Sequence, residues 1–211
     1  GQLVFLIYTD INSDILMIVA ICFSLCLVPL AVTRALHPTP MKAAPLEIAF
    51  FLKKMPQVLL ITAIGGMMSG SFYGLAPIFA NRLGLTTHET GIFMAVSIGA
   101  ALFAQWPLAW LSDNFNRLKL VTIISGLIVI TITLLIIPRS SFGVWVIPIL
   151  LLSILITGLQ FTIYPLTVAI ANDNIDEERR VSLSAIILVV YGLGSAIGPL
   201  ISASISDRFS G

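Results

Sequence analysis

Residues 56–80 read PQVLLITAIGGMMSGSFYGLAPIFA, a run without a single formally charged side chain. An α-helix needs roughly 17–25 apolar residues to cross the ~30 Å hydrocarbon core of a bilayer, because each residue advances about 1.5 Å. Further apolar runs occupy residues 15–32, 90–111, 118–138, 143–171 and 181–205, and Lys119 is the one charged residue within them. Soluble helices keep a polar face for water, so these runs predict an all-α membrane protein with six complete transmembrane helices.

Composition places the chain in the same class. Hydrophobic residues make up 58% of the chain and charged residues 10%, and the mean hydropathy is +1.05. Soluble domains average about 25% charged residues. All other charged residues fall outside the apolar runs, and Lys119 is the second residue of the run 118–138. The net charge of +1, without a basic cluster larger than two residues, argues against nucleic acid as a partner.

The 2 cysteines, Cys22 and Cys26, lie one helical turn apart in the run 15–32. A structural zinc site needs four ligands, and this pair has no companions in its run. We interpret both cysteines as ordinary apolar positions of a helix, and we expect neither a metal nor a cofactor.

Lysine and arginine are distributed unevenly between alternate loops. Loops 33–55, 112–119 and 172–180 hold eight of the 11 basic residues, and the loops of the opposite side hold Arg82, Arg139 and Arg208. The positive-inside rule therefore predicts that the first three loops are cytoplasmic. The expected location is a cell membrane, crossed several times, and specifically a bacterial inner membrane.

The longest connection is loop 33–55. It contains Pro38, Pro40 and Pro45, which disfavour a continuous helix. Residues 46–54 are predicted to form a short amphipathic helix on the membrane surface. A long linker between closely connected spans indicates a boundary between two helical bundles.

Two pairs of segments echo each other at an offset of three runs. Residues 72–81 and 161–172 share a pattern of aromatic residues, a Pro and a final Ala-Asn, and residues 107–115 and 199–209 share Pro-Leu followed by Ser-Asp and Phe. An offset of three spans reverses the orientation in the membrane. The echoes therefore predict an inverted three-plus-three repeat, as found within the halves of some transporters.

Residues 105–117, QWPLAWLSDNFNR, resemble the cytoplasmic loop motif of the major facilitator superfamily, roughly G-x-L-(A/S)-D-(R/K)-x-G-R-(R/K). The matching residues are Leu111, Ser112, Asp113 and Arg117, and the departures are Ala109, Asn114, Asn116 and Leu118. Together with YPLTVAIAND at 164–173 and YGLGSAIGP at 191–199, this segment looks like the YcaD-like subgroup of that superfamily. The resemblance covers essentially the whole chain and implies a major facilitator superfamily-type helical bundle.

The resemblance allows two registers. In the preferred register, residues 1–35 are the tail of an N-terminal bundle, with the end of helix five and helix six, and 36–55 is the central cytoplasmic linker. Residues 56–211 are then helices seven to eleven of the C-terminal bundle, with helix twelve missing. In the other register, 56–80 is helix one, which leaves the run 15–32 and the apolar segment before it unexplained.

Asp113 and Arg117 lie at the cytoplasmic end of the run 90–111. The resemblance implies that this pair latches one conformation of a transporter. A partly desolvated ion pair suits a switch, because ligand binding can offset the cost of breaking it. The alternative is a pair of solvated loop charges, which is also what we expect of residues 173–180.

The substrate cavity is expected along the runs 56–80 and 143–171, as the resemblance implies. No ionisable Asp, Glu, Lys, Arg or His lies deep within a run, so the usual marker of a proton relay or a charged substrate is absent. We expect these side chains to line the cavity: Tyr73, Gln160, Tyr164, Gln105 and Tyr191. An uncharged cavity favours a neutral or amphipathic substrate, with any proton-carrying acid outside this chain.

Small residues recur every four positions in the runs 56–80 and 181–205. The members are Gly66, Gly70, Gly74, Gly194 and Gly198, with Pro199 following the last. Faces of this kind let helices approach closely in lipid. Two interpretations stay open, namely static packing and a sliding or hinging contact during alternating access.

Three functions fit such a bundle. The resemblance implies a secondary active transporter that moves a small solute by alternating access, with the bilayer, a small-molecule substrate, a coupling proton and the missing N-terminal half as partners. An intramembrane enzyme would need a Ser/His, paired Asp or His/Glu set at membrane depth, and His37 and His88 both fall in loops, so we predict no enzyme. A non-transporting sensor or scaffold of transporter ancestry is the alternative.

Overall fold

The computed structural model describes residues 13–32, 47–136 and 146–209 of the chain. The predicted end of an earlier helix at 1–8, most of the linker 36–55, His37 and Arg139 lie outside the described residues. The described helices are α1 (Ser13–Val32), α2 (Ile48–Lys54), α3 (Pro56–Arg82), α4 (Thr87–Asn114), α5 (Arg117–Ile136), α6 (Val146–Asp173), the 3₁₀ turn η3 (Glu177–Arg179) and α7 (Arg180–Phe209). No strand occurs in this part of the chain, which confirms the all-α prediction.

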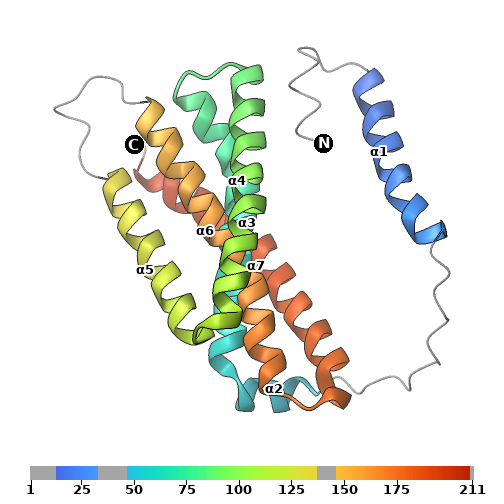
Figure 1. Cartoon of the computed structure of the whole chain (residues 1–211). Helices are drawn as coiled ribbons and strands as arrows, with labels where there is room; N and C mark the ends of the chain where they lie inside the picture. The colour runs from blue at the N-terminus through green and yellow to red at the C-terminus, as the bar shows by residue number, and fades with distance from the viewer. Residues whose placement is uncertain (1–12, 33–46, 137–145, 210–211) are drawn as a thin grey trace.

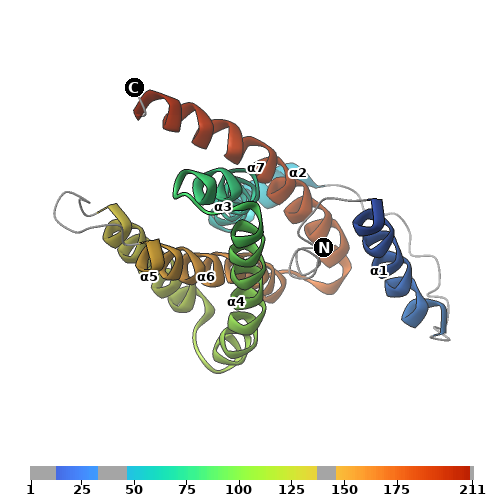
Figure 2. The same cartoon turned by 90° about the horizontal axis from the view of Figure 1, so that it is seen from above.

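Helices α3 to α7 are the 5 described helices that are long and apolar enough to cross a membrane. They correspond to the predicted runs from 56–80 onwards. The remaining predicted span, 15–32, corresponds to the 20-residue helix α1. Its described apolar stretch, Met17–Pro29, is shorter than those of α3 to α7. α1 stands apart from the other helices in both views, and most of its described side chains are exposed (Figures 1 and 2). The division of the chain at 36–55 stays a prediction.

Local chemistry explains where the helices begin. Thr86 and Glu89 form a capping box at the start of α4, in which the Glu89 N–H donates to Thr86 Oγ1 (3.3 Å) and the Thr86 N–H donates to Glu89 Oε2 (2.7 Å). Gly84, at φ +86°, supplies the left-handed residue in the turn before it. At α5, Asn116 Oδ1 accepts from the Leu118 and Lys119 N–H groups at 3.0 and 3.2 Å. These caps lie within a few residues of the predicted limits.

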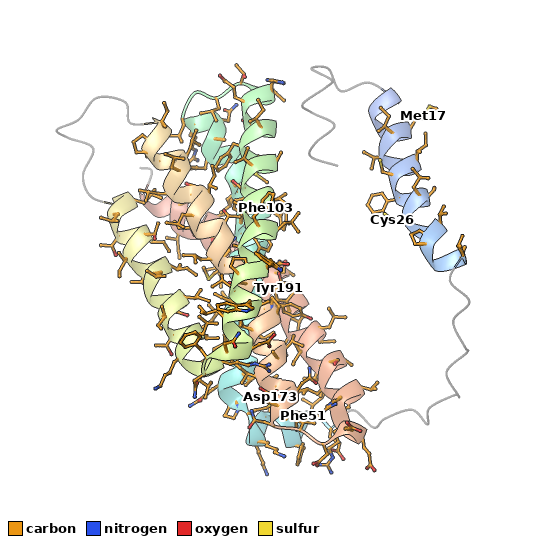
Figure 3. All side chains as sticks on the ribbon, viewed as in Figure 1. Met17, Cys26, Phe51, Phe103, Asp173 and Tyr191 are labelled. Atoms are coloured by element: carbon orange, nitrogen blue, oxygen red, sulfur yellow. The ribbon has the colours of Figure 1, made fainter. Side chains whose placement is uncertain are left out.

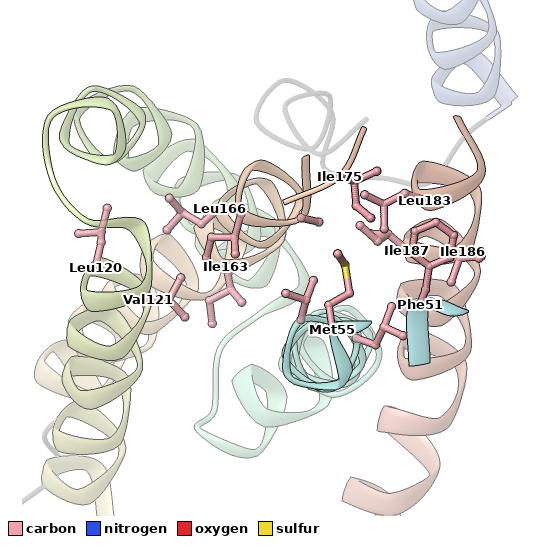
Figure 4. Packing of buried hydrophobic residues seen from close by; sticks show 14 of the residues in the cluster. Phe51, Met55, Leu120, Val121, Ile163, Leu166, Ile175, Leu183, Ile186 and Ile187 are labelled. Carbon is pink, nitrogen blue, oxygen red and sulfur yellow. The ribbon is translucent and has the colours of Figure 1, made fainter. Parts of the chain in front are cut away.

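The bundle is built on two crossing pairs, α3 with α7 and α4 with α6, and α5 packs against α6 on the outside (Figure 1). Short connections make α3, α5 and α7 run in one direction and α4 and α6 in the other. The larger buried cluster lies where α3, α5, α6 and α7 meet and includes Ile124, Ile163, Leu166 and Ile187 (Figure 4). The outer faces of the helices are covered with exposed Leu, Ile, Val and Phe, as expected of surfaces that face lipid.

Helix α2 confirms the prediction of a short helix within 46–54, but it is docked rather than free. Phe51 is 0% exposed and Met55 is 7% exposed, and both belong to the buried cluster of the bundle. Figure 4 shows Phe51 beside Ile186 and Ile187 of α7. The prediction of a helix lying on the membrane surface therefore described only its outer side, because the sequence pattern alone does not show that Phe51 finds a pocket between α3 and α7.

Candidate functional site

The turn between α4 and α5 places Arg117 next to the end of the helix before it. α4 ends at Asn114, Phe115 is extended at φ −126° and ψ 165°, and α5 begins at Arg117 itself. The Asn116 cap fixes this tight reversal. The guanidinium consequently points back over α4, where its Nε donates to the Ser112 carbonyl oxygen at 3.4 Å.

Arg117 joins two helix ends through its carboxylate partners. Its Nη1 donates to Asp173 Oδ2 at 2.7 Å, and its Nη2 donates to Asp113 Oδ1 at 3.3 Å. Asp113 belongs to α4 and Asp173 is the last residue of α6. We call Asp113, Arg117 and Asp173 the arginine bridge. The structure thus brings the predicted latch residues together and adds a third member.

The arginine bridge is accessible to water. The Arg117 side chain is 26% exposed, that of Asp173 56% and that of Asp113 72%. Exposed ion pairs contribute only about 0–1 kcal/mol each, because water screens the charges and long side chains lose entropy. The bridge is therefore less desolvated than the expected latch pair, and each of its ion pairs can open and close at small cost.

The sequence predicts Asp173 to be a solvated loop charge and does not reveal its contact with Arg117. The short loops provided a usable signal, because α4 and α6 run in the same direction and both end in an Asp-containing segment on one side of the membrane. Figure 3 places Asp173 near the end of the bundle that also carries Phe51. The sequence does not specify that the ends of α4 and α6 are neighbours, and this is why the contact between Arg117 and Asp173 could not be predicted.

A groove of about 220 Å³ runs between α4 and α6 above the arginine bridge. Its walls carry Gln105, Ala109 and Thr162, and Asp113 and Arg117 lie at its end. Gln105 is exposed here and contacts no described polar partner by hydrogen bond. The structure therefore places Gln105 in a different location from the predicted tyrosines.

The predicted aromatic side chains of the cavity gather at the meeting point of α3, α6 and α7. The rings of Tyr164 and Tyr191 lie 4.6 Å apart, and the ring of Tyr73 lies 5.6 Å from that of Phe161. Tyr191 is about halfway along the bundle (Figure 3). Tyr73 is 49% exposed, whereas Gln160 is buried and its Nε2 has no hydrogen-bond partner among the described residues. Their role in a cavity stays a prediction.

The predicted glycine faces form the crossing of α3 and α7. A Cβ at Gly66 or Gly70 would collide with the backbone of Tyr191 or Ser195, and a Cβ at Gly194 or Gly198 would collide with the backbone of α3 at residues 63 and 67. A Cβ at Gly74 would lie 3.4 Å from the ring of Pro199, and Ser71 Oγ and Ser202 Oγ share a hydrogen bond of 2.9 Å. Only glycine permits so close an approach of two helix backbones.

Within the described residues there is no group of three or more His, Cys, Asp or Glu side chains that could hold a metal ion. Cys22 and Cys26 are free and exposed on α1.

The family described as Major Facilitator Superfamily matches residues 13–210 of the chain. A protein named "Uncharacterized MFS-type transporter YcaD" from Escherichia coli O17:K52:H18 is 30% identical over 186 residues, which cover 87% of this chain and 47% of the relative. The proteins of the same name from Shigella flexneri and from Escherichia coli O139:H28 are 30% and 29% identical over the same shares. The chain spans about half the length of the curated relatives it matches. No solved structure matches the chain.

Proposed function

The chain belongs to the major facilitator superfamily, and on that premise we propose that the protein is a secondary active transporter that moves a small solute by alternating access. The relatives that carry names are called transporters, not enzymes. The proposed place of action is a bacterial inner membrane, which the protein crosses several times. The proposed substrate is neutral or amphipathic, because no acid or base lies deep within the described spans.

The arginine bridge is the observation that carries this proposal. A carrier needs contacts at one membrane face that hold one conformation and can be released. Arg117 holds the cytoplasmic ends of α4 and α6 together at 2.7 Å to Asp173 and 3.3 Å to Asp113, in a setting where water can replace either partner. The glycine crossing of α3 and α7 offers a smooth contact along which two helices can shift.

The energy source is proposed to be an ion gradient, with the proton as the coupling ion. The group that carries the proton is proposed to lie in the remainder of the protein, since the described spans contain no buried carboxylate. The latch would then respond to a protonation event at a distance from it, through movement of the helices.

Reconstitution of the full-length protein tests the proposal. Proteoliposomes with an imposed proton gradient are incubated with a bacterial cell extract, and the solutes that accumulate inside are identified by mass spectrometry. We expect at least one solute to accumulate, and its uptake to stop when the gradient is collapsed. If folded, correctly inserted protein accumulates nothing beyond empty liposomes, the protein is a sensor or scaffold and the transport proposal fails.

A further inference from the structure

Helix α2 has a docked side and a free side. Phe51 and Met55 are buried in the bundle. The ring of Phe50 is covered by the Arg179 guanidinium at 4.3 Å, and Arg179 Nε also lies 3.4 Å from Glu47 Oε2. Contacts on both sides of Phe51 therefore hold this seven-residue helix in one orientation on the protein.

The free side of α2 combines apolar and basic side chains. Ile48 is 52% exposed and Leu52 is 55% exposed, one helical turn apart, and Lys53 is exposed next to Leu52. Lys54 is also exposed, and its Nζ lies 5.4 Å from the centre of the Phe50 ring. Among the described residues no carboxylate lies within salt-bridge distance of either lysine, whereas Glu47 is paired with Arg179. The part of α2 that does not contact the bundle thus carries an apolar strip and two positive charges that have no carboxylate partner among the described residues.

The length of α3 indicates where α2 would lie relative to a bilayer. α3 follows directly and contains 27 residues, which corresponds to a length of about 40 Å, close to the thickness of a bilayer with its headgroup regions. Since α3 enters the membrane from its N-terminal end, α2 lies beside the headgroups and not in the hydrocarbon. Figure 1 shows α2 at the same end of the bundle as the start of α7.

We propose that the free side of α2 is a binding surface for anionic phospholipid, with Lys53 and Lys54 on the headgroup phosphates and Ile48 and Leu52 among the first acyl carbons. A lysine near an anionic membrane surface contributes about 1 kcal/mol, or roughly fivefold in binding. The pair should contribute about 30-fold at low salt. Because α2 is already held by Phe51 and Arg179, little conformational entropy is lost when lipid binds.

This surface is independent of the proposed transport, and its test measures no transport. The full-length protein is purified in a neutral detergent, and its thermal midpoint is measured while phosphatidylglycerol or phosphatidylcholine is titrated in. We expect phosphatidylglycerol to raise the midpoint at much lower concentration than phosphatidylcholine does. The double variant Lys53→Gln/Lys54→Gln should need about 30-fold more phosphatidylglycerol, and 0.5 M salt should have a similar effect on the unaltered protein.

Lys119→Gln is the matched control, because Lys119 is also exposed and belongs to the same predicted cytoplasmic side. It should keep the full response to phosphatidylglycerol. An equal response in all three proteins, or no preference for phosphatidylglycerol, overturns the proposal; the latter result is expected if another part of the protein covers α2. A comparable rise with 10 mM inorganic phosphate instead of lipid also overturns it, since the site would then bind a free anion.

Discussion

Arg117 shows how one side chain can connect three segments of a membrane protein. Its guanidinium has five N–H donors in a planar fork, so it can serve two carboxylates and a carbonyl at once. The stronger geometry is with Asp173, at 2.7 Å, a residue 56 positions away in sequence. At this scale the superfamily motif predicted the pair Asp113 and Arg117, but the third partner became visible only when α4 and α6 were placed side by side.

Replacing the more distant partner tests the arginine bridge. We expect Asp173→Asn to lower the initial rate of solute uptake at least as much as Asp113→Asn. Asp173 makes the shorter of the two ion pairs with Arg117, and it is the member of the arginine bridge that belongs to α6. The double variant should show less than the sum of the two effects, since both carboxylates act on the same guanidinium. The measurement is uptake in proteoliposomes, normalised to inserted protein.

Asp176→Asn is the control for that experiment. Asp176 lies in the same loop and is exposed, and no described ion pair involves it. Its replacement should leave uptake unchanged. If Asp173→Asn and Asp113→Asn also leave uptake unchanged, the arginine bridge is a surface contact without a role in transport.

At the scale of elements, the crossing of α3 and α7 is the tightest contact of the bundle. We expect Gly70→Ala to destabilise the protein by about 1–3 kcal/mol, because the added methyl group forces the helix backbones apart. Gly192→Ala on α7 is the matched control, since no atom lies within 4 Å of its Cβ position, and alanine is the better helix former there. Thermal unfolding in detergent measures both; equal midpoints would show that the crossing relaxes freely.

Helix α2 provides a second prediction at this scale. Phe51→Ala should destabilise the protein by about 3–5 kcal/mol, because it leaves a cavity between α3 and α7 where the ring is 0% exposed. Leu52→Ala, at a side chain that is 55% exposed, should change the stability little. The same thermal measurement checks the pair, and a small effect of Phe51→Ala would mean that α2 is not anchored in solution.

The long helices could be predicted from sequence because the length and polarity of a run are local properties. Helices α3, α4 and α7 are longer than their runs, for example Thr87–Asn114 against 90–111, because helices continue into the headgroup region, where polar residues such as Asn114 are tolerated. The burial of Phe51 and the contact between Arg179 and Phe50 could not be predicted. Both join segments far apart in sequence, and nothing in a local pattern specifies which distant surface an aromatic ring will meet.

At the scale of the whole molecule, the direction of each helix is the property to test. With Cys22 and Cys26 replaced by serine, Arg82→Cys and Lys119→Cys should be labelled from opposite sides of the membrane, because α4 lies between them. A membrane-impermeant maleimide applied to intact cells should react at position 82 and not at 119. Labelling of both positions from one side would contradict the topology and, with it, the assignment of cytoplasmic loops.

The connection between α6 and α7 is fastened at each end, by Asp173 to Arg117 and by Arg179 to Glu47 and Phe50. At this end of the bundle, side-chain contacts therefore connect α5 with the end of α6, and the start of α7 with α2. A displacement of α2 is passed to the start of α7 through the contacts of Arg179 with Glu47 and Phe50. When the arginine bridge opens, the ends of α4 and α6 can separate while Arg179 keeps the start of α7 attached to α2.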